Sequence, residues 1–374
     1  MNRINSNRKS KPDYLLALAI FALTMFGLIA IFSVSKYYSM QITNNATDKY
    51  YLVKQLQWVG IGLVFWFVAQ SIDYKYWQKN SKYMLFITIA LLVLPLFFGH
   101  KEGSSAARWI GFGIFQFQPS ELAKLTMIFY LSGWLSNKQE VNEINKSSFI
   151  FFLFVAIIAV IMLIQKDLGT LAVIVGIAGA MFIMSGVSMV QVFAAGGLST
   201  FLLWLAIKIE PYRMSRFATF LNPEQDLLGT GYHIRNALIA IGSGGLWGLG
   251  FGQSKQKYLY LPEAHTDSIF AIIAEELGFL RTSAVVLLIL FIAWRGYIIA
   301  KRAPDSFSRL VAVGITTWFI WQSFINIAAM LSMVPLTGVP LPFVSYGGTS
   351  LIILLASSGI LINISKYCQK RVGE

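Results

Sequence analysis

The sequence YLLALAIFALTMFGLIAIFS, residues 14–33, contains no charged side chain. A helix of about 20 apolar residues can cross the hydrocarbon core of a bilayer. Polar and basic residues precede this run, and no small-residue cleavage site follows it, so we interpret it as a retained membrane span rather than a signal peptide. The whole chain of 374 residues is 56% hydrophobic and 13% charged, whereas soluble domains carry about 25% charged residues. We therefore predict an all-α polytopic membrane protein.

Ten apolar segments along the chain predict about ten transmembrane helices. With the N-terminus in the cytoplasm, the inner segments hold sixteen Lys and Arg residues and the short outer loops hold six. Cytoplasmic loops are enriched in these residues, so we expect both termini in the cytoplasm. The net charge of +13 then reflects topology and not nucleic-acid binding. The ten segments are residues 14–34, 53–72, 80–99, 119–136, 148–165, 168–185, 190–208, 279–299, 310–333 and 345–365.

Residues 209–266 form the only long connection, between predicted helices 7 and 8, and they would lie outside the cytoplasm. Loops of this length usually have a function. We predict a short helix at residues 232–241 within it. Residues 267–299 are too many for one straight span, so we expect a half-helix at 267–277 and a hinge near Gly278. The chain would form one integral-membrane domain, residues 1–374, with residues 1–13 as a cytoplasmic tail.

Unusual polar motifs occupy four segments, residues 108–124, 165–170, 209–267 and 335–350, all at the predicted outer ends of helices. Glu121 and Lys124 are three residues apart and could pair. Such charges in a span either join helices or shape a cavity. Asp167 could cap the helix that follows it or face the same cavity. Arg213 and Arg216 could grip the phosphates of a pyrophosphate lipid or ordinary anionic headgroups.

Residues 261–279, LPEAHTDSIFAIIAEELGF, carry four acids in an apolar context. Asp267 could cap the half-helix or act as a general base, partly desolvated and close to cations. Glu263 could also be the base, and helical periodicity alone does not choose between them. The three histidines are scattered without paired spacing and the single cysteine, Cys368, lies in the basic tail. We therefore predict no metal site built from His or Cys and no disulfide.

The motifs resemble those of the SEDS family (shape, elongation, division and sporulation), bacterial membrane proteins that polymerise peptidoglycan glycan strands from lipid II. The similarity covers residues 52–364 and is greater to the cell-division branch than to the rod-shape branch. Ser268 stands where the family usually has Phe, Lys166 where it has Pro, and Arg281 where small residues are common. The motifs are Arg108-Trp-Ile, Gln118-Pro-Ser-Glu-Leu-Ala-Lys124, Asp167-Leu-Gly-Thr170, Gly231-Tyr-His, Leu261-Pro-Glu-Ala-His-Thr-Asp267, Ala274-Glu-Glu-Leu-Gly278 and Pro340-Leu-Pro-Phe-Val-Ser-Tyr-Gly-Gly-Thr-Ser350.

This resemblance implies an inverting glycosyltransferase that uses lipid II in septal cell-wall synthesis and releases undecaprenyl pyrophosphate. Asp267 would be the general base, and cations would stabilise the leaving group. A divalent cation, Mg²⁺ or Mn²⁺, could assist them. The implied substrate-binding residues are Arg108, Glu121, Lys124, Asp167, Arg213, Arg216, Glu263, His265 and Ser345.

The resemblance also implies a multi-pass protein of the bacterial cytoplasmic (inner) membrane, with its active site facing the extracytoplasmic side. Its partners would be a class B penicillin-binding transpeptidase and other cell-division proteins. Three alternatives stay open: a lipid II flippase, a scaffold that recruits the transpeptidase, and the same polymerase activity in elongation and rod-shape maintenance. Asp267 separates enzyme from flippase, because only the enzyme needs a carboxylate there.

Overall fold

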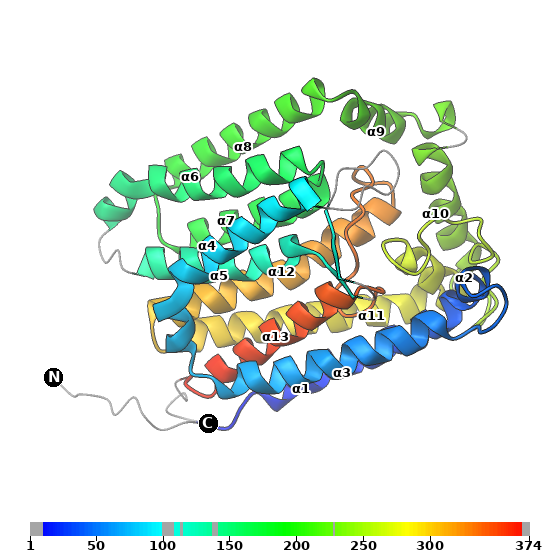
Figure 1. Cartoon of the computed structure of the whole chain (residues 1–374), viewed down its shortest axis with the longest axis horizontal. Helices are drawn as coiled ribbons and strands as arrows, with labels where there is room; N and C mark the ends of the chain where they lie inside the picture. The colour runs from blue at the N-terminus through cyan, green and yellow to red at the C-terminus, as the bar shows by residue number, and fades with distance from the viewer. Residues whose placement is uncertain (1–9, 99–107, 113–114, 137–140, 227–228, 369–374) are drawn as a thin grey trace.

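A computed structural model describes residues 10–98, 108–112, 115–136, 141–226 and 229–368, and the described residues are predominantly helical (Figure 1). The first nine residues of the predicted cytoplasmic tail lie outside these ranges. The elements are α1 Tyr14–Val34, α2 Lys36–Ile42, α3 Tyr50–Ser71, α4 Tyr74–Phe98, β1 Ile110–Phe112, β2 Phe115–Phe117, α5 Pro119–Ser136, α6 Val141–Ile164, α7 Leu168–Met184, α8 Met189–Ile209, α9 Pro211–Leu221, the 3₁₀ turn η1 Pro223–Gln225, α10 Thr230–Gly244, α11 Ile269–Arg302, α12 Ser306–Met330 and α13 Gly348–Ser365.

Each of the ten predicted spans coincides with one long helix: α1, α3 to α8, and α11 to α13. By length and composition, seven described helices could cross a membrane, and the apolar helices Phe151–Ile164 and Leu168–Met184 are shorter. This confirms the all-α polytopic fold, whereas the number of helices that cross the membrane stays a prediction. α13 begins at Gly348, three residues later than predicted, because the proline-containing residues 340–347 form turns instead.

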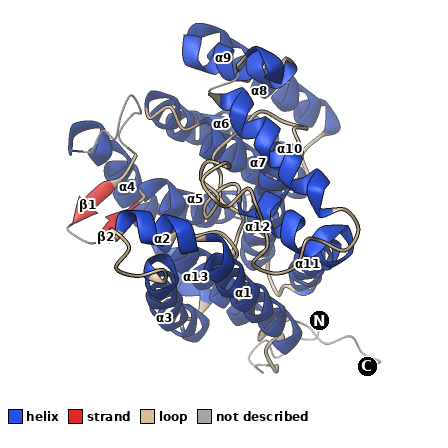
Figure 2. Ribbon diagram, turned by 90° about the vertical axis from the view of Figure 1, so that its right-hand side faces the viewer, coloured by secondary structure: helices blue, strands red, loops and turns tan. Residues whose placement is uncertain are grey.

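α12 and α13 form the centre of the bundle, and α8 lies at its rim (Figure 2). In the most apolar 18-residue window, 78% of residues are buried in α12 and in α13, against 6% in α8. α13 approaches α3 closely because a glycine lies between them: a Cβ on Gly359 would be 2.5 Å from the carbonyl oxygen of Trp66. α8 therefore exposes its apolar side chains to lipid. α12 is buried, so its polar side chains can contact a site inside the protein.

The N-terminal and C-terminal segments meet at one end of the bundle. The backbone N–H of Ser10 donates to the carbonyl of Lys366 at 2.7 Å, and Asp13 pairs with Arg295 in α11 at 2.5 Å. This end lies opposite α10 (Figure 1). That the first and last described segments lie at the same end agrees with the distribution of Lys and Arg, although the side of the membrane that this end faces stays a prediction.

The predicted hinge near Gly278 is confirmed. Gly278 has φ 75° and ψ 178° inside α11, which the residues on either side continue as helix. This conformation is essentially restricted to glycine, and a Cβ at this position would lie 2.1 Å from the backbone nitrogen of Gly248. The first half of α11 starts at Ile269 and packs against α10. Asp267 and Ser268 precede it in a turn, so Asp267 is not part of the half-helix.

The long connection is itself folded. It contains α9, η1 and α10, and the predicted helix 232–241 lies within α10. Residues 245–268 then run through turns. Two of the four acids within residues 261–279, Glu275 and Glu276, hold these turns in place. The carboxylate of Glu275 accepts bonds from the Ser254 hydroxyl and from the backbone N–H of Lys255. Glu276 pairs with Lys257 at 2.8 Å and accepts a bond from a serine of α1. These acids anchor the loop, which explains their place in an apolar helix.

Two small elements were not predicted from the sequence, α2 and the antiparallel pair β1–β2. The strands pair Ile110 with Phe117 directly before α5. Thr349 of α13 donates to the carbonyl of Gln116 at 2.9 Å. The hairpin thereby fixes the start of α5 against the start of α13.

Candidate active site

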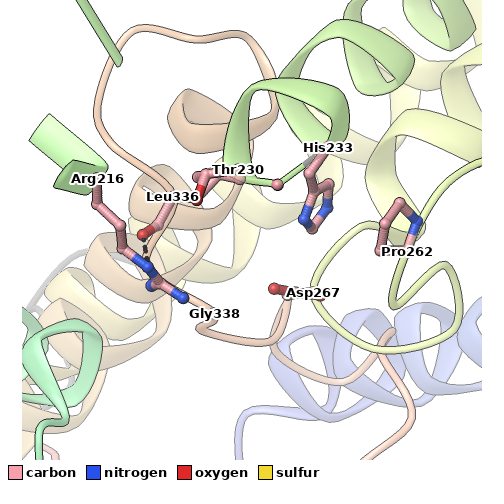
Figure 3. Close-up of a pocket in the computed structure, with 8 residues that line it drawn as sticks. Arg216, Thr230, His233, Pro262, Asp267, Leu336 and Gly338 are labelled. Atoms are coloured by element: carbon pink, nitrogen blue, oxygen red, sulfur yellow. Dashed lines mark hydrogen bonds between the residues drawn. The ribbon is translucent and has the colours of Figure 1, made fainter. Parts of the chain in front are cut away.

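A cavity of about 220 Å³ opens between α9, α10, the turn before α11 and the loop after α12 (Figure 3). Its polar side chains come from three of these segments, far apart in sequence but all within the motifs noted above or beside them. Asp267 lies on one side and Arg216 on another (Figure 3). The lining residues are Arg216, Gly229, Thr230, His233, Pro262, Asp267, Leu336 and Gly338.

Asp267 is placed by backbone contacts and does not cap α11. The side-chain amide of Asn326 in α12 donates to the carbonyl of Asp267 at 2.7 Å and to that of Val339 at 2.8 Å. The Asp267 carboxylate accepts a bond of 3.3 Å from the Thr266 hydroxyl. Ser268 occupies the cap position of α11 without a side-chain cap bond. The carboxyl group is thus left to face the cavity.

The environment of Asp267 suits a general base. Burial, and then the negative charge of Glu263, raise the pKa of Asp267 from 3.8 to about 7, while the Thr266 hydrogen bond and Arg216 oppose this rise. A carboxyl group with a pKa near the working pH is ionised in a useful fraction of molecules and is far more basic than an ordinary aspartate. Helical periodicity did not choose between Asp267 and Glu263 as the base, whereas the family resemblance indicated Asp267. The cavity also favours Asp267, since Glu263 is exposed outside it.

The three predicted outer arginines have different surroundings. Arg216 lines the cavity, where its guanidinium donates to the carbonyl of Leu336 at 3.1 Å. Arg213 is buried and donates to Leu163 at 2.7 Å and to Ala206 at 3.0 Å, joining α6 to α8. Both acceptors are carbonyls near the ends of helices, so the observed contacts of Arg213 hold helices together.

Arg108 also contacts the end of α6. Its guanidinium donates to the carbonyl of Gln165 at 3.1 Å and to that of Lys166. Asp167, directly after this turn, caps α7: it accepts the backbone N–H of Thr170 at 3.1 Å and the Thr170 hydroxyl at 2.9 Å. Arg108 and Asp167 do not line the described cavity. A substrate role for them stays a prediction.

Glu121 and Lys124 form a buried ion pair of 2.7 Å. Lys124 also donates to Gln322 of α12 at 2.9 Å and lies over the ring of Trp318. Gln322 in turn donates to the carbonyl of Pro340 at 2.9 Å. The pair therefore joins α5 to α12 and, through Gln322, supports the loop that carries Leu336 and Gly338. It lies in the core and not on the described cavity, and substrate binding by it stays a prediction.

Glu263, His265 and Ser345 do not line the described cavity. The carboxylate of Glu263 accepts the Thr266 hydroxyl at 2.8 Å. The buried ring of His265 lies 4.3 Å from the Tyr51 ring centre, and burial lowers the pKa of this histidine. Ser345 accepts the backbone N–H of Leu341 at 2.8 Å. Substrate-binding roles for these three residues stay predictions.

Thr230, His233 and the loop at 336–338 were not predicted as site residues. His233 lies in the motif Gly231-Tyr-His, but its position in the sequence shows only that it lacks metal-ligand spacing. No feature of the sequence places α10 over Asp267, since this depends on the packing of α10 against α11. Among the described residues, no group of three or more His, Cys, Asp or Glu side chains could hold a metal ion.

The fold is a bundle of apolar helices, as in a multi-pass membrane protein. One cavity in it carries both a carboxylate and a guanidinium, which makes a site suited to a polar, anionic ligand. The chain belongs to the cell cycle protein family of FtsW, RodA and stage V sporulation protein E, whose family model matches residues 14–370.

Similar proteins include stage V sporulation protein E of Bacillus subtilis (strain 168), 40% identical over 97% of this chain and 99% of that protein. The probable peptidoglycan glycosyltransferase FtsW of Trichlorobacter lovleyi is 36% identical over 96% of this chain and 94% of that protein. Among solved structures, a chain of a peptidoglycan synthase complex superposes with a TM-score of 0.77 at 23% identity, covering 95% of this chain and 97% of that chain. The rod shape determining protein RodA of Thermus thermophilus superposes with a TM-score of 0.69 at 25% identity, covering 96% and 98%.

Proposed function

We propose that this protein is a peptidoglycan glycosyltransferase that polymerises lipid II into glycan strands. The observation that carries the proposal is that the carboxyl group of Asp267 and the guanidinium of Arg216 line the same cavity. Relatives at 36% identity are named probable peptidoglycan glycosyltransferases, and they match nearly the whole chain. The cavity has a carboxylate that can accept a proton and a guanidinium that can bind phosphate oxygens, and glycosyl transfer from a diphosphate needs both.

In the proposed reaction, Asp267 accepts the proton of the 4-hydroxyl of an acceptor sugar. The oxygen attacks the anomeric carbon of the donor from the face opposite the diphosphate, and a C–O bond forms with inversion. The bond from the anomeric carbon to the diphosphate oxygen breaks, and undecaprenyl pyrophosphate leaves with the electron pair. Arg216 would stabilise the charge that develops on this leaving group. Asn326 holds the backbone of Asp267 in place and thereby keeps the base oriented.

We also propose that the cavity faces the extracytoplasmic side of the bacterial inner membrane. The excess of Lys and Arg in the segments assigned to the cytoplasm supports this orientation. A class B penicillin-binding transpeptidase would be the partner, in line with the structural neighbour from a peptidoglycan synthase complex. Septal synthesis is the proposed setting, although the relatives include a sporulation protein as well as FtsW.

Mg²⁺ or Mn²⁺ stays part of the proposal only as an ion that arrives with the diphosphate. Mg²⁺ commonly binds through one or two carboxylates together with substrate phosphates. The described residues contain no cluster of three ligating side chains, so they do not fit a resident metal. Dependence of polymerisation on added Mg²⁺ or Mn²⁺ would test this part.

The test is polymerisation by the purified protein with its cognate transpeptidase, given lipid II in detergent. The wild type should make glycan strands, and Asp267→Asn should lower the rate by about 10²-fold or more, since its amide cannot accept the proton. Glu224→Gln, an exposed acid of the same connection, is the matched control and should retain activity. Lipid II translocation in vesicles that persists in Asp267→Asn, without polymerisation by the wild type, would instead identify a flippase.

A further inference from the structure

His233 is the one histidine that lines the described cavity, and its ring has a defined partner. It extends from α10 toward the side where Asp267 lies (Figure 3). Its Nε2 is 2.6 Å from the hydroxyl oxygen of Ser268, and this hydroxyl lies 2.9 Å from the carbonyl oxygen of Pro262. Ser268 is fully buried. The three groups therefore form a short chain of hydrogen bonds along the cavity wall.

The chemistry of this chain determines the tautomer of His233. The carbonyl of Pro262 can only accept, so the single hydroxyl proton of Ser268 is donated to it. The oxygen of Ser268 must then accept the proton of His233 Nε2. Burial lowers the pKa of His233 to about 4, which keeps the ring neutral near pH 7. A neutral ring with its proton on Nε2 has a lone pair on Nδ1.

The Nδ1 atom of His233 is available to a ligand. It has no hydrogen-bond partner among the residues that the structure describes, and His233 lines the cavity. His265 provides the contrast, because its Nδ1 is buried without a partner and it lies outside the cavity lining. His233 thus presents a fixed acceptor in the same cavity as Asp267.

We propose that His233 is a substrate-binding residue whose Nδ1 accepts a hydrogen bond from a hydroxyl or amide N–H of the acceptor sugar. Ser268 is then a positioning residue that holds the tautomer. This inference rests on the proposed function, since it names a further contact for the same saccharide.

A matched pair of substitutions at His233 tests the acceptor. The amide of Asn can place its oxygen near the position of Nδ1, whereas the amide of Gln reaches the position of Nε2. His233→Gln should raise the KM for lipid II by about tenfold with a smaller change in kcat, as expected for a lost hydrogen bond. His233→Asn should raise KM less than His233→Gln does. Ser243→Ala, on the exposed side of α10, should leave both constants unchanged.

Lipid II binding measured in an Asp267→Asn background separates this inference from the proposed function. A loss of affinity of about tenfold on adding His233→Gln supports the contact even if no polymerisation is seen. Polymerisation by the wild type with unchanged KM and affinity in His233→Gln would overturn the inference and leave the proposed function intact.

The tautomer can be read directly by ¹⁵N NMR of histidine-labelled protein, because the chain has only three histidines. The wild type should show His233 neutral with its proton on Nε2, and Ser268→Ala should give a mixture of tautomers with a raised KM. A proton on Nδ1 in the wild type would contradict the proposal.

Discussion

The protonation state of Asp267 should control the rate at the level of a single residue. Its pKa is about 7 instead of 3.8, so the ionised base disappears as the pH falls through neutrality. We expect kcat/KM for polymerisation to rise with pH through about 7 and then level off. Steady-state rates between pH 5 and 9 would measure this. A rate that is flat across this range would exclude Asp267 as the base.

Glu263 offers a second test of the same residue. Its negative charge is one of the two causes that raise the pKa of Asp267. Glu263→Gln removes this charge, so Asp267 should ionise more readily and the rising limb of the pH profile should move to lower pH. Glu224→Gln is the remote control and should not move the limb. A shift to higher pH would contradict the electrostatic account.

Asn326 should act on the rate through Asp267. It donates to the carbonyls of Asp267 and Val339, and both bonds are lost in Asn326→Leu. Small misplacements of a catalytic group can cost about 10²-fold, so we expect kcat to fall by about 10- to 100-fold with little change in KM. Ser323→Ala should be near wild type, because the hydroxyl of Ser323 donates to the carbonyl of Phe319 within the same helix, α12. An equal loss in both variants would argue for general destabilisation instead.

At this scale, the sequence predicted the residues of interest but not their partners. Four acids lie within residues 261–279, and helical spacing gives only the face on which each lies. Glu275 and Glu276 hold the preceding loop, Glu263 is exposed, and only Asp267 lines the cavity. Those contacts depend on a loop that folds back over α11, and no local pattern encodes this.

At the level of elements, Gly278 should be the least replaceable position in α11. Gly278→Ala combines a positive φ with a contact of 2.1 Å to backbone, and the strain alone costs about 1–3 kcal/mol. We expect a lower thermal unfolding temperature in detergent and reduced activity, because the half-helix after Asp267 would shift. Gly242→Ala is the control: it lies in α10 with open space around it, and Ala should raise helix stability by up to about 1 kcal/mol. Equal unfolding temperatures for the two variants would refute the argument.

The long helices were predictable because length and apolar composition suffice to recognise them. The hinge was predictable because 33 residues exceed one straight span and a glycine lies at a suitable place. α2 and the β1–β2 pair were missed, since each has only a few residues and their stability depends on contacts with distant segments. One such contact is the bond from Thr349 of α13 to Gln116.

At the level of the whole molecule, packing separated residues that look equivalent in the sequence. Arg213 and Arg216 are one helical turn apart on α9, yet one joins α6 to α8 and the other lines the cavity. The Glu121–Lys124 pair had two open interpretations, and its observed contacts join helices. Which charges face a cavity depends on how all the helices assemble, and this is the part that sequence patterns do not contain.

The orientation of the bundle in the membrane can be tested because Cys368 is the only cysteine. In a Cys368→Ser background, single cysteines would be introduced at Glu224, exposed in η1 near the cavity end, and at Lys75, exposed at the start of α4. A membrane-impermeant maleimide applied to intact spheroplasts should label Glu224→Cys and should label Lys75→Cys only after permeabilisation. This result follows from the excess of Lys and Arg on the cytoplasmic side. The reverse pattern would place the cavity in the cytoplasm, where a lipid-linked sugar on the outer leaflet could not reach Asp267, and the proposed reaction would fail with it.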